Sequence, residues 1–166
     1  MLNQATIDTL TEDRARIVAE SMRGPADRPP TTARGVHHAA LISSDVRQTV
    51  AFYQDLLGFP LTDMFENRDY RGSTHFFFDI GNGNALAFFD LPGLDLGEYA
   101  EVLGGLHHIA ISMEPDQWQQ ARDRLDGAGV HYDHVSGTSL YFRDPDGARL
   151  ELIADPLGEM YGTKVV

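Results

Sequence analysis

The chemistry of this 166-residue sequence is indicated first by a repeated pair of adjacent histidines. The segment GVHHAALIS at residues 35–43 returns 70 residues later as GLHHIAISM at residues 105–113. Small and apolar residues alternate in both copies as they do in a strand, so the second histidine of each pair, His38 or His108, faces away from the first. Two imidazoles in matching positions that face one cavity are suited to bind a divalent metal ion.

A third ligand is predicted in the segment RLELI near the C-terminus, where Glu151 lies between Leu150 and Leu152. A buried carboxylate without a partner would cost several kcal/mol, so it needs a cation. We therefore predict that His38, His108 and Glu151 bind one divalent metal ion. Two imidazoles and one carboxylate leave coordination positions open on a six-coordinate ion, which is the facial triad of non-haem Fe(II) oxygenases.

The elements that position these residues follow a repeated order. Each histidine segment precedes a helical pattern, expected at 45–57 and at 115–128, which a glycine then ends. Three strand-like runs follow each helix, at 59–65, 74–80 and 85–89 and then at 130–135, 139–143 and 149–153. The sequence therefore predicts an α+β fold of two tandem βαβββ modules, 35–90 and 105–155, that form a cupped mixed sheet around the metal site.

Residues 1–34 are predicted to be a helical extension and a linker outside the metal-binding domain. Residues 4–22 mix apolar and charged residues as one or two short amphipathic helices do, and residues 24–34 contain three prolines. The domain is expected at 35–155, and residues 156–166 are expected to be a C-terminal tail.

Composition restricts the partners. A net charge of −12 with only 13 basic residues predicts no binding to nucleic acid or to anionic lipid, which require clustered Lys and Arg. The absence of cysteine excludes thiolate metal sites, and no run of 18 or more apolar residues or leader pattern occurs. We expect a cytoplasmic protein that acts on a small-molecule substrate and does not bind a membrane.

The sequence resembles the vicinal oxygen chelate superfamily, which includes glyoxalase I, fosfomycin and bleomycin resistance proteins and extradiol catechol dioxygenases. The resemblance covers about residues 35–155, and it is carried by the two histidine segments, FYQDLLG at 52–58 and DPDGARLE at 144–151. It implies a bound divalent metal ion and a homodimer. In some members the metal-binding cup is built across the subunit interface.

One departure from glyoxalase I and one similarity to the extradiol dioxygenases narrow the expected activity. The fourth, carboxylate ligand of glyoxalase I falls at Ala87 or Phe88, and neither residue binds metal. The signature of the extradiol dioxygenases looks similar to the run from His134 through Tyr141 to Glu151. This resemblance implies that Tyr141 hydrogen-bonds a substrate oxygen and that His134 transfers a proton.

The sequence therefore favours an Fe(II)-dependent extradiol-type dioxygenase, an oxidoreductase that acts on a small aromatic or vicinal dioxygenated substrate. Mn(II), Ni(II) and Zn(II) are the alternative metals. The alternative functions are a glyoxalase-like isomerase or lyase, an antibiotic-resistance transferase and a drug-binding protein. No organic cofactor is expected.

Overall fold

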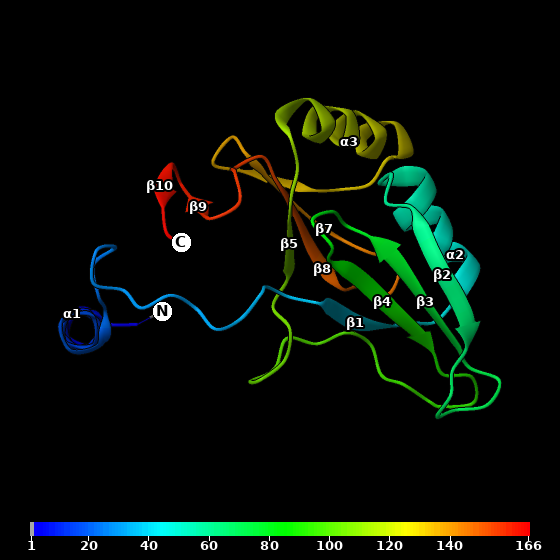
Figure 1. Ribbon diagram of the computed structural model, residues 1–166, viewed down its shortest axis with the longest axis horizontal. Helices are drawn as coiled ribbons and strands as arrows, with labels where there is room; N and C mark the ends of the chain where they lie inside the picture. The colour runs from blue at the N-terminus through cyan, green and yellow to red at the C-terminus, as the bar shows by residue number, and fades with distance from the viewer. Residues whose placement is uncertain (1) are drawn as a thin grey trace. The chain divides into compact units, whose positions relative to one another are not determined.

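The computed structural model describes residues 2–166, which divide into two compact units, one up to Gly35 and the other from Val36 on. In the first unit, a single helix α1 spans Gln4–Ser21 (Figure 1). The side chain of Asn3 caps it by accepting a hydrogen bond from the Thr6 N–H at 2.9 Å. None of the residues of α1 is buried.

The second unit, Val36–Val166, contains both predicted modules. The first module consists of β1 (His38–Ser43), α2 (Val46–Val50), the π-helix η1 (Ala51–Leu56), β2 (Leu61–Glu66), β3 (Thr74–Asp79) and β4 (Ala85–Asp90). Its four strands form one sheet in the order β1-β4-β3-β2, with β1 parallel to β4. The α2 and η1 segments run on from each other, so they fill the place of the one predicted helix.

The second module repeats this plan. It consists of β5 (Ile109–Ser112), α3 (Pro115–Ala128), β6 (Asp133–Val135), β7 (Ser139–Arg143) and β8 (Arg149–Ile153). Its sheet has the order β5-β8-β7-β6, again with the first and last strands parallel. Two short strands that were not predicted, β9 (Glu159–Met160) and β10 (Thr163–Lys164), pair in the C-terminal tail. The α+β fold of two βαβββ modules is confirmed, with two separate four-stranded sheets.

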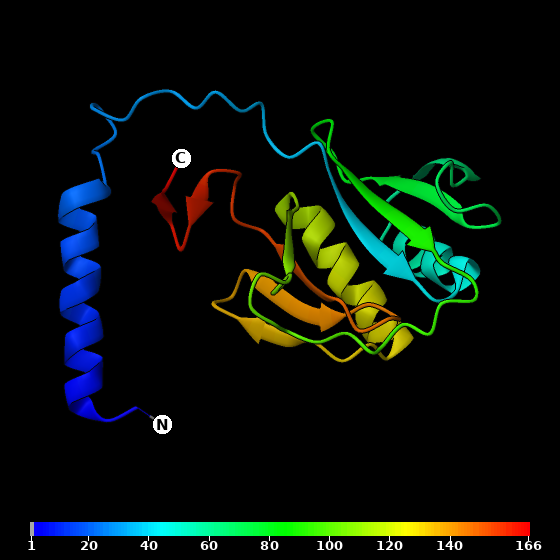
Figure 2. The same ribbon diagram turned by 90° about the horizontal axis from the view of Figure 1, so that it is seen from below.

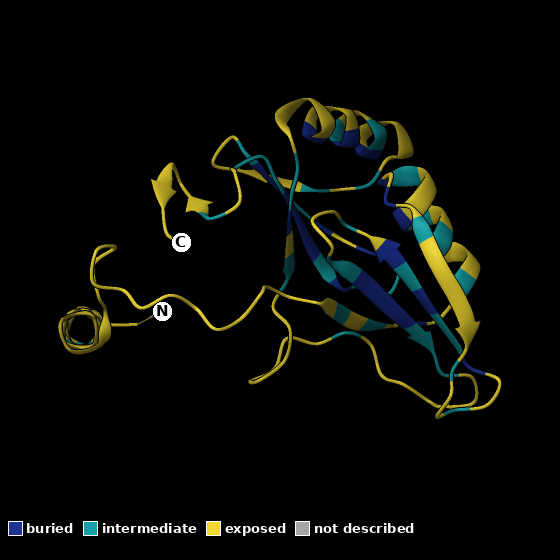
Figure 3. Cartoon of the chain, viewed as in Figure 1, coloured by how far each residue is buried: buried dark blue, intermediate teal, exposed yellow. Residues whose placement is uncertain are grey.

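The two modules share one hydrophobic core, which the helices and one face of each sheet enclose (Figure 3). Its fully buried members come from both modules, and the largest of them are Tyr53, Phe76, Phe78, Phe88, Leu125, Leu140, Leu150 and Leu152. Between η1 and α3 the guanidinium of Arg124 donates to the carbonyls of Leu56 at 2.6 Å and Leu57 at 3.0 Å. The helix-covered faces of both sheets are therefore buried in the core of a single chain.

The opposite face of each sheet has no such cover. Along β1, His38, Ala40 and Ile42 are exposed, whereas Ala39, Leu41 and Ser43 point toward the core and are at least partly buried. Both β1 and β5 lie at the edge of their sheets (Figure 2). The two histidine segments therefore lie at open edges of the second unit. No helix among residues 2–166 is long and apolar enough to cross a membrane.

Candidate metal centre

Two of the three predicted metal ligands meet on the open face of the second module. His108 Nε2 lies 3.1 Å from Glu151 Oε2, with side-chain exposures of 29% and 6%. The parallel register of β5 and β8 explains the contact, because Ala110 lies opposite Glu151 and shares a face with His108, two residues earlier. The side chains of Leu150 and Leu152, on either side of Glu151, enter the core.

The spacing of this pair fits ligation of one metal ion. Ligand bonds of ~2.1 Å at about a right angle place two ligand atoms ~3.0 Å apart. The other carboxylate oxygen, Glu151 Oε1, accepts a hydrogen bond from Ser139 at 2.5 Å, and His108 Nδ1 is paired with His107 Nδ1 at 2.7 Å. Partners on the outer atoms orient metal ligands in proteins. Glu151 Oε2 and His108 Nε2 remain directed toward each other.

Tyr141 lies beside this pair, as the resemblance implies. The antiparallel register places it opposite Glu151, and its ring centroid is 5.5 Å from that of His108 in an edge-on contact. Burial, assisted by the Glu151 carboxylate, raises the pKa of Tyr141 to about 12. The phenol is therefore protonated at neutral pH and is able to donate a hydrogen bond.

Ser139 and Arg149 share this face, although the sequence did not single them out. The guanidinium of Arg149 lies 5.1 Å from the Tyr141 ring centroid, and its Nη1 is 3.6 Å from Glu101. The sequence signal that could have found them is the alternation of strand residues between two faces. Ser139 stands two residues before Tyr141 and Arg149 two residues before Glu151, so each shares a face with a predicted site residue.

His38, the third predicted ligand, does not join the pair within one chain. Among residues 2–166 no three side chains of His, Cys, Asp or Glu lie close enough together to hold a metal ion. His38 is exposed, and its Nδ1 is paired with His37 Nδ1 at 2.9 Å, just as His108 is paired with His107. The two histidine pairs therefore have the same local geometry on separate sheets.

The structure places His134 on the other face of the second sheet. It lies opposite Leu140, a core residue, and its ring is 5.6 Å from that of Trp118 on α3. Tyr141 and Glu151 point to the opposite side because Tyr141 pairs with Asp133. The expected proton-transfer role of His134 therefore has no support from its position in one chain.

The register also decides which residue replaces the fourth ligand of glyoxalase I. In the second module Ala110 pairs with Glu151, and in the first module Ala40 occupies the place of Ala110 and pairs with Ala87. Ala87 is therefore the counterpart of Glu151. Its methyl group provides no ligand atom.

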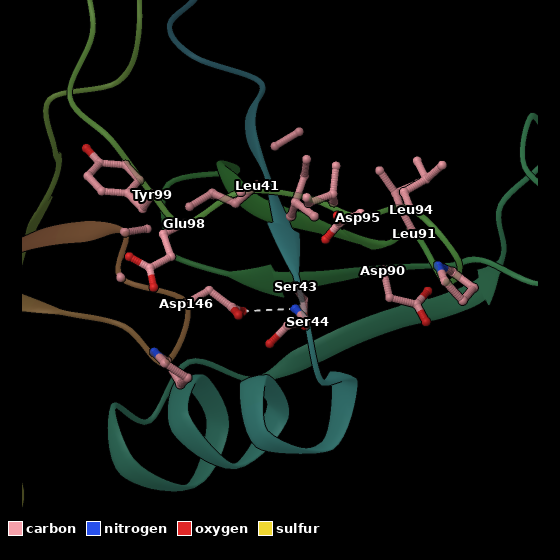
Figure 4. A pocket seen from close by; sticks show the side chains of 18 of the residues that line it. Leu41, Ser43, Ser44, Asp90, Leu91, Leu94, Asp95, Glu98, Tyr99 and Asp146 are labelled. Carbon is pink, nitrogen blue, oxygen red and sulfur yellow. Dashed lines mark hydrogen bonds between the residues drawn. The ribbon is translucent and has the colours of Figure 1, made fainter.

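A separate cavity of about 1000 Å³ lies between β1, the linker after β4 and the turn between β7 and β8. Figure 4 shows Asp90, Asp95, Glu98 and Asp146 among its lining residues, with the Ser44 N–H donating to Asp146 at 3.1 Å. Its lining includes none of the three predicted metal ligands. The cavity is therefore distinct from the candidate metal centre.

Two βαβββ modules, the second of which carries an imidazole and a carboxylate on its open sheet face, match the superfamily that the sequence resembles. The chain belongs to the Glyoxalase/Bleomycin resistance protein/Dioxygenase superfamily, whose family model matches residues 35–152. Enzymes of this superfamily are metal-dependent and act on small molecules.

Three similar proteins represent different reactions. The chain is 26% identical to a candidate ring-cleaving dioxygenase, MhqA of Bacillus subtilis (strain 168), over 79% of this chain and 43% of the relative. It is 31% identical to lactoylglutathione lyase of Haemophilus influenzae, over 70% of this chain and 89% of the relative. A crystal structure of a variant of the fosfomycin resistance protein FosX from Listeria monocytogenes with Mn(II) and 1S,2S-dihydroxypropylphosphonic acid is 25% identical, with a TM-score of 0.58 over 76% of this chain and 96% of that chain.

These relatives differ in length as well as in reaction. The chain spans less than half of MhqA, whereas it spans most of the lyase and of FosX. Membership of the superfamily therefore establishes the fold and the general type of protein and leaves the reaction open.

Proposed function

We propose that this protein is an Fe(II)-dependent extradiol-type dioxygenase for a small aromatic or vicinal dioxygenated substrate, with His38, His108 and Glu151 as metal ligands. The observation that carries the proposal is the 3.1 Å approach of His108 Nε2 to Glu151 Oε2 on an open sheet face, with Tyr141 beside it. Residues 35–155 contain every proposed ligand, and residues 1–34 and 156–166 lie outside the proposed domain.

In our proposal two copies of the chain complete each site, so the protein acts as a homodimer. His38 lies on one sheet, and His108 and Glu151 lie on the other, while the shared core keeps the helix-covered faces of both sheets together. A twofold arrangement would bring the β1 edge of one copy to the β5 edge of its partner and form two equivalent sites. His38 of each copy would then supply the ligand that its own chain does not bring to Glu151.

The chain's own residues have separate tasks at this site. When bound, the metal ion supplies a Lewis acid and an electron conduit between substrate and dioxygen. Tyr141, which is protonated at neutral pH, donates a hydrogen bond to a substrate oxygen, and Ser139 holds Glu151 in its orientation. Arg149 places a positive charge next to Tyr141, where it stabilises a substrate that has lost a proton.

Arg149 also supports a second candidate, a transferase that acts on an anionic antibiotic. A guanidinium binds a phosphonate by paired hydrogen bonds, and Arg149 lies on the metal-ligand face. The isomerase or lyase alternative is weaker because Ala87 replaces the second carboxylate. A drug-binding protein would lack stoichiometric metal.

The shared site is tested by mixing two inactive variants, His38→Ala and Glu151→Ala. Each variant alone is expected to lose metal, because each dimer has one ligand missing from both sites. A mixed dimer has both defects in one site and none in the other, so free exchange restores about a quarter of all sites. Iron content after anaerobic loading and oxygen uptake with a panel of catechols are the measurements.

Recovery of both iron and oxygen uptake on mixing supports the proposal. Wild-type protein that retains no iron contradicts the metal site, and full iron without oxygen uptake contradicts the dioxygenase and favours the transferase. Failure of the mixed variants to recover metal that wild-type protein holds contradicts the shared site. The exposed-loop variant His131→Ala, which leaves every proposed ligand in place, is the matched control and should retain iron and oxygen uptake on its own.

A further inference from the structure

The open face of the first module has lost the polar groups that its counterpart carries. Matching the two sheets by register makes Ala87 the equivalent of Glu151. Phe77, which pairs with Ala87, is then the equivalent of Tyr141. The sheet that carries His38 is therefore apolar where the sheet that carries His108 is polar.

The same matching gives His75 an unusual position. It pairs with Phe89 as Ser139 pairs with Ile153, so His75 is the counterpart of the serine that orients Glu151. Because Ala87 stands where Glu151 would be, His75 has no carboxylate to bind. Its Nε2 atom is buried and has no hydrogen-bond partner in the structure.

Aromatic rings surround this imidazole. The His75 ring stacks on Phe89 at 3.8 Å between centroids and lies 4.3 Å from Phe77 and 5.3 Å from Phe65. We call these four residues the aromatic patch. Phe65 is 46% exposed and Phe77 and Phe89 are half-buried, so the patch is accessible from the open side of the sheet.

The aromatic patch adjoins the proposed metal site. The ring of His38 lies edge-on to Phe77 with centroids 6.4 Å apart. A ligand held near His38 would thus have the half-buried Phe77 along one side. Rings stack on rings at such distances, whereas an aliphatic chain gains only the apolar contact.

We propose that the aromatic patch binds an aromatic ring of the substrate, and that this ring displaces a phenyl ring that covers His75 Nε2 and forms a hydrogen bond with that atom through a polar substituent. The inference rests on the proposed function only in placing the metal at His38, and it selects the aromatic substrate over the aliphatic vicinal diol. A buried polar atom without a partner is uncommon in a folded protein, and a substrate oxygen would provide the missing partner. Burial lowers the pKa of His75, which keeps the imidazole neutral and able to serve either as donor or as acceptor.

The test uses full-length protein loaded with Zn(II), so that binding is measured without turnover. Calorimetry compares catechol with propane-1,2-diol as probes for the wild type, His75→Leu, His75→Gln and Phe77→Leu. We expect His75→Leu to weaken catechol binding about tenfold, His75→Gln to restore part of it, and Phe77→Leu to weaken catechol while leaving the diol unchanged. His131→Gln, which changes an exposed histidine outside the patch, is the matched control.

Zinc stoichiometry and dimer mass are measured on every variant. A wild type that binds catechol no better than propane-1,2-diol overturns the inference, and so does a His75→Leu variant with unchanged catechol affinity or with a lost dimer. If the wild type binds no metal, the proposed function fails, and the same comparison with metal-free protein still decides whether the aromatic patch prefers a ring. A preference that His75→Leu and Phe77→Leu abolish in that protein supports the inference.

Discussion

Tyr141 is the single residue whose role at the candidate site is most directly testable. The variant Tyr141→Phe retains the ring that contacts His108 and removes only the hydroxyl. We expect metal content to be unchanged and kcat to fall about 10²-fold, because a hydrogen-bond donor to the reacting oxygen is lost. Metal analysis and oxygen uptake with the best catechol are the measurements.

Tyr132→Phe is the control for this experiment. The Tyr132 hydroxyl donates to Asp126 at 2.8 Å, and Asp126 lies on α3, on the other side of the sheet from Tyr141. Loss of the Tyr132 hydroxyl should therefore leave kcat unchanged. An equal effect of both variants, or none of Tyr141→Phe, would remove Tyr141 from the mechanism.

Single residues also show how far the sequence predicted the candidate site. The structure brings together His108 and Glu151, two of the residues that the sequence singled out, because β5 and β8 are short, regular and in parallel register. Alternation could not tell which face His134 lies on, because the turn between β6 and β7 decides which residues of the two strands pair. Residues 136 and 137, both with positive φ, form that turn and leave Asp133 opposite Tyr141. The partners of His38 could not be derived, because no local pattern states whether the proposed ligands of one metal ion come from one chain or from two.

At the scale of elements, a buried hydrogen bond joins η1 to the turn between β7 and β8. The Tyr53 hydroxyl donates to Asp144 Oδ2 at 2.9 Å, and the other oxygen of that carboxylate accepts the N–H groups of Asp146 and Ala148. One carboxylate thus holds its own hairpin turn and the helix of the other module. The bond therefore links the local structure of one module to the packing of both.

Removal of this hydroxyl should destabilise the protein in a pH-dependent way. We expect Tyr53→Phe to lower the free energy of unfolding by ~1–3 kcal/mol at pH 7. Burial raises the pKa of Asp144, so its ionised form costs stability as the pH rises through that pKa, and the Tyr53 hydroxyl opposes this cost. The loss should therefore shrink as the pH falls toward 4 and the carboxyl is protonated.

Urea unfolding of the variant and the wild type at pH 7 and near pH 4 gives the measurement. Tyr70→Phe is the control, since its hydroxyl donates to the Pro92 carbonyl at 2.8 Å in an exposed loop. A deficit of the same size at both pH values would show that the charge on Asp144 does not govern what the Tyr53 hydroxyl contributes.

The elements themselves were largely predictable. Apolar spacing placed α3 at Pro115–Ala128, and the left-handed conformation of Gly129, with φ of 69°, explains why a glycine ends it. The turn chemistry of Asp144 to Gly147 fixed the hairpin of β7 and β8. The π-helix η1 was not predictable, because its residues show the same apolar spacing as an ordinary helix. The pairing of the tail strands was missed because each is only two residues long.

At the scale of the whole molecule, α1 is expected to contribute little to the stability of Val36–Val166. No residue of α1 is buried, and α1 belongs to a compact unit of its own, up to Gly35. We expect a chain that lacks residues 1–34 to keep its thermal unfolding midpoint and its Zn(II) content. Calorimetry and metal analysis check both, and a lower midpoint would show that α1 packs on the modules.

The common core of the two modules has a consequence for how the protein would acquire its metal. Because each copy presents its histidine segments on separate sheets, loading under the proposed assembly is second order in protein and falls on dilution. At low abundance the chains would stay folded but would hold no metal and have no activity. A modest rise in expression would then switch on a disproportionate share of activity.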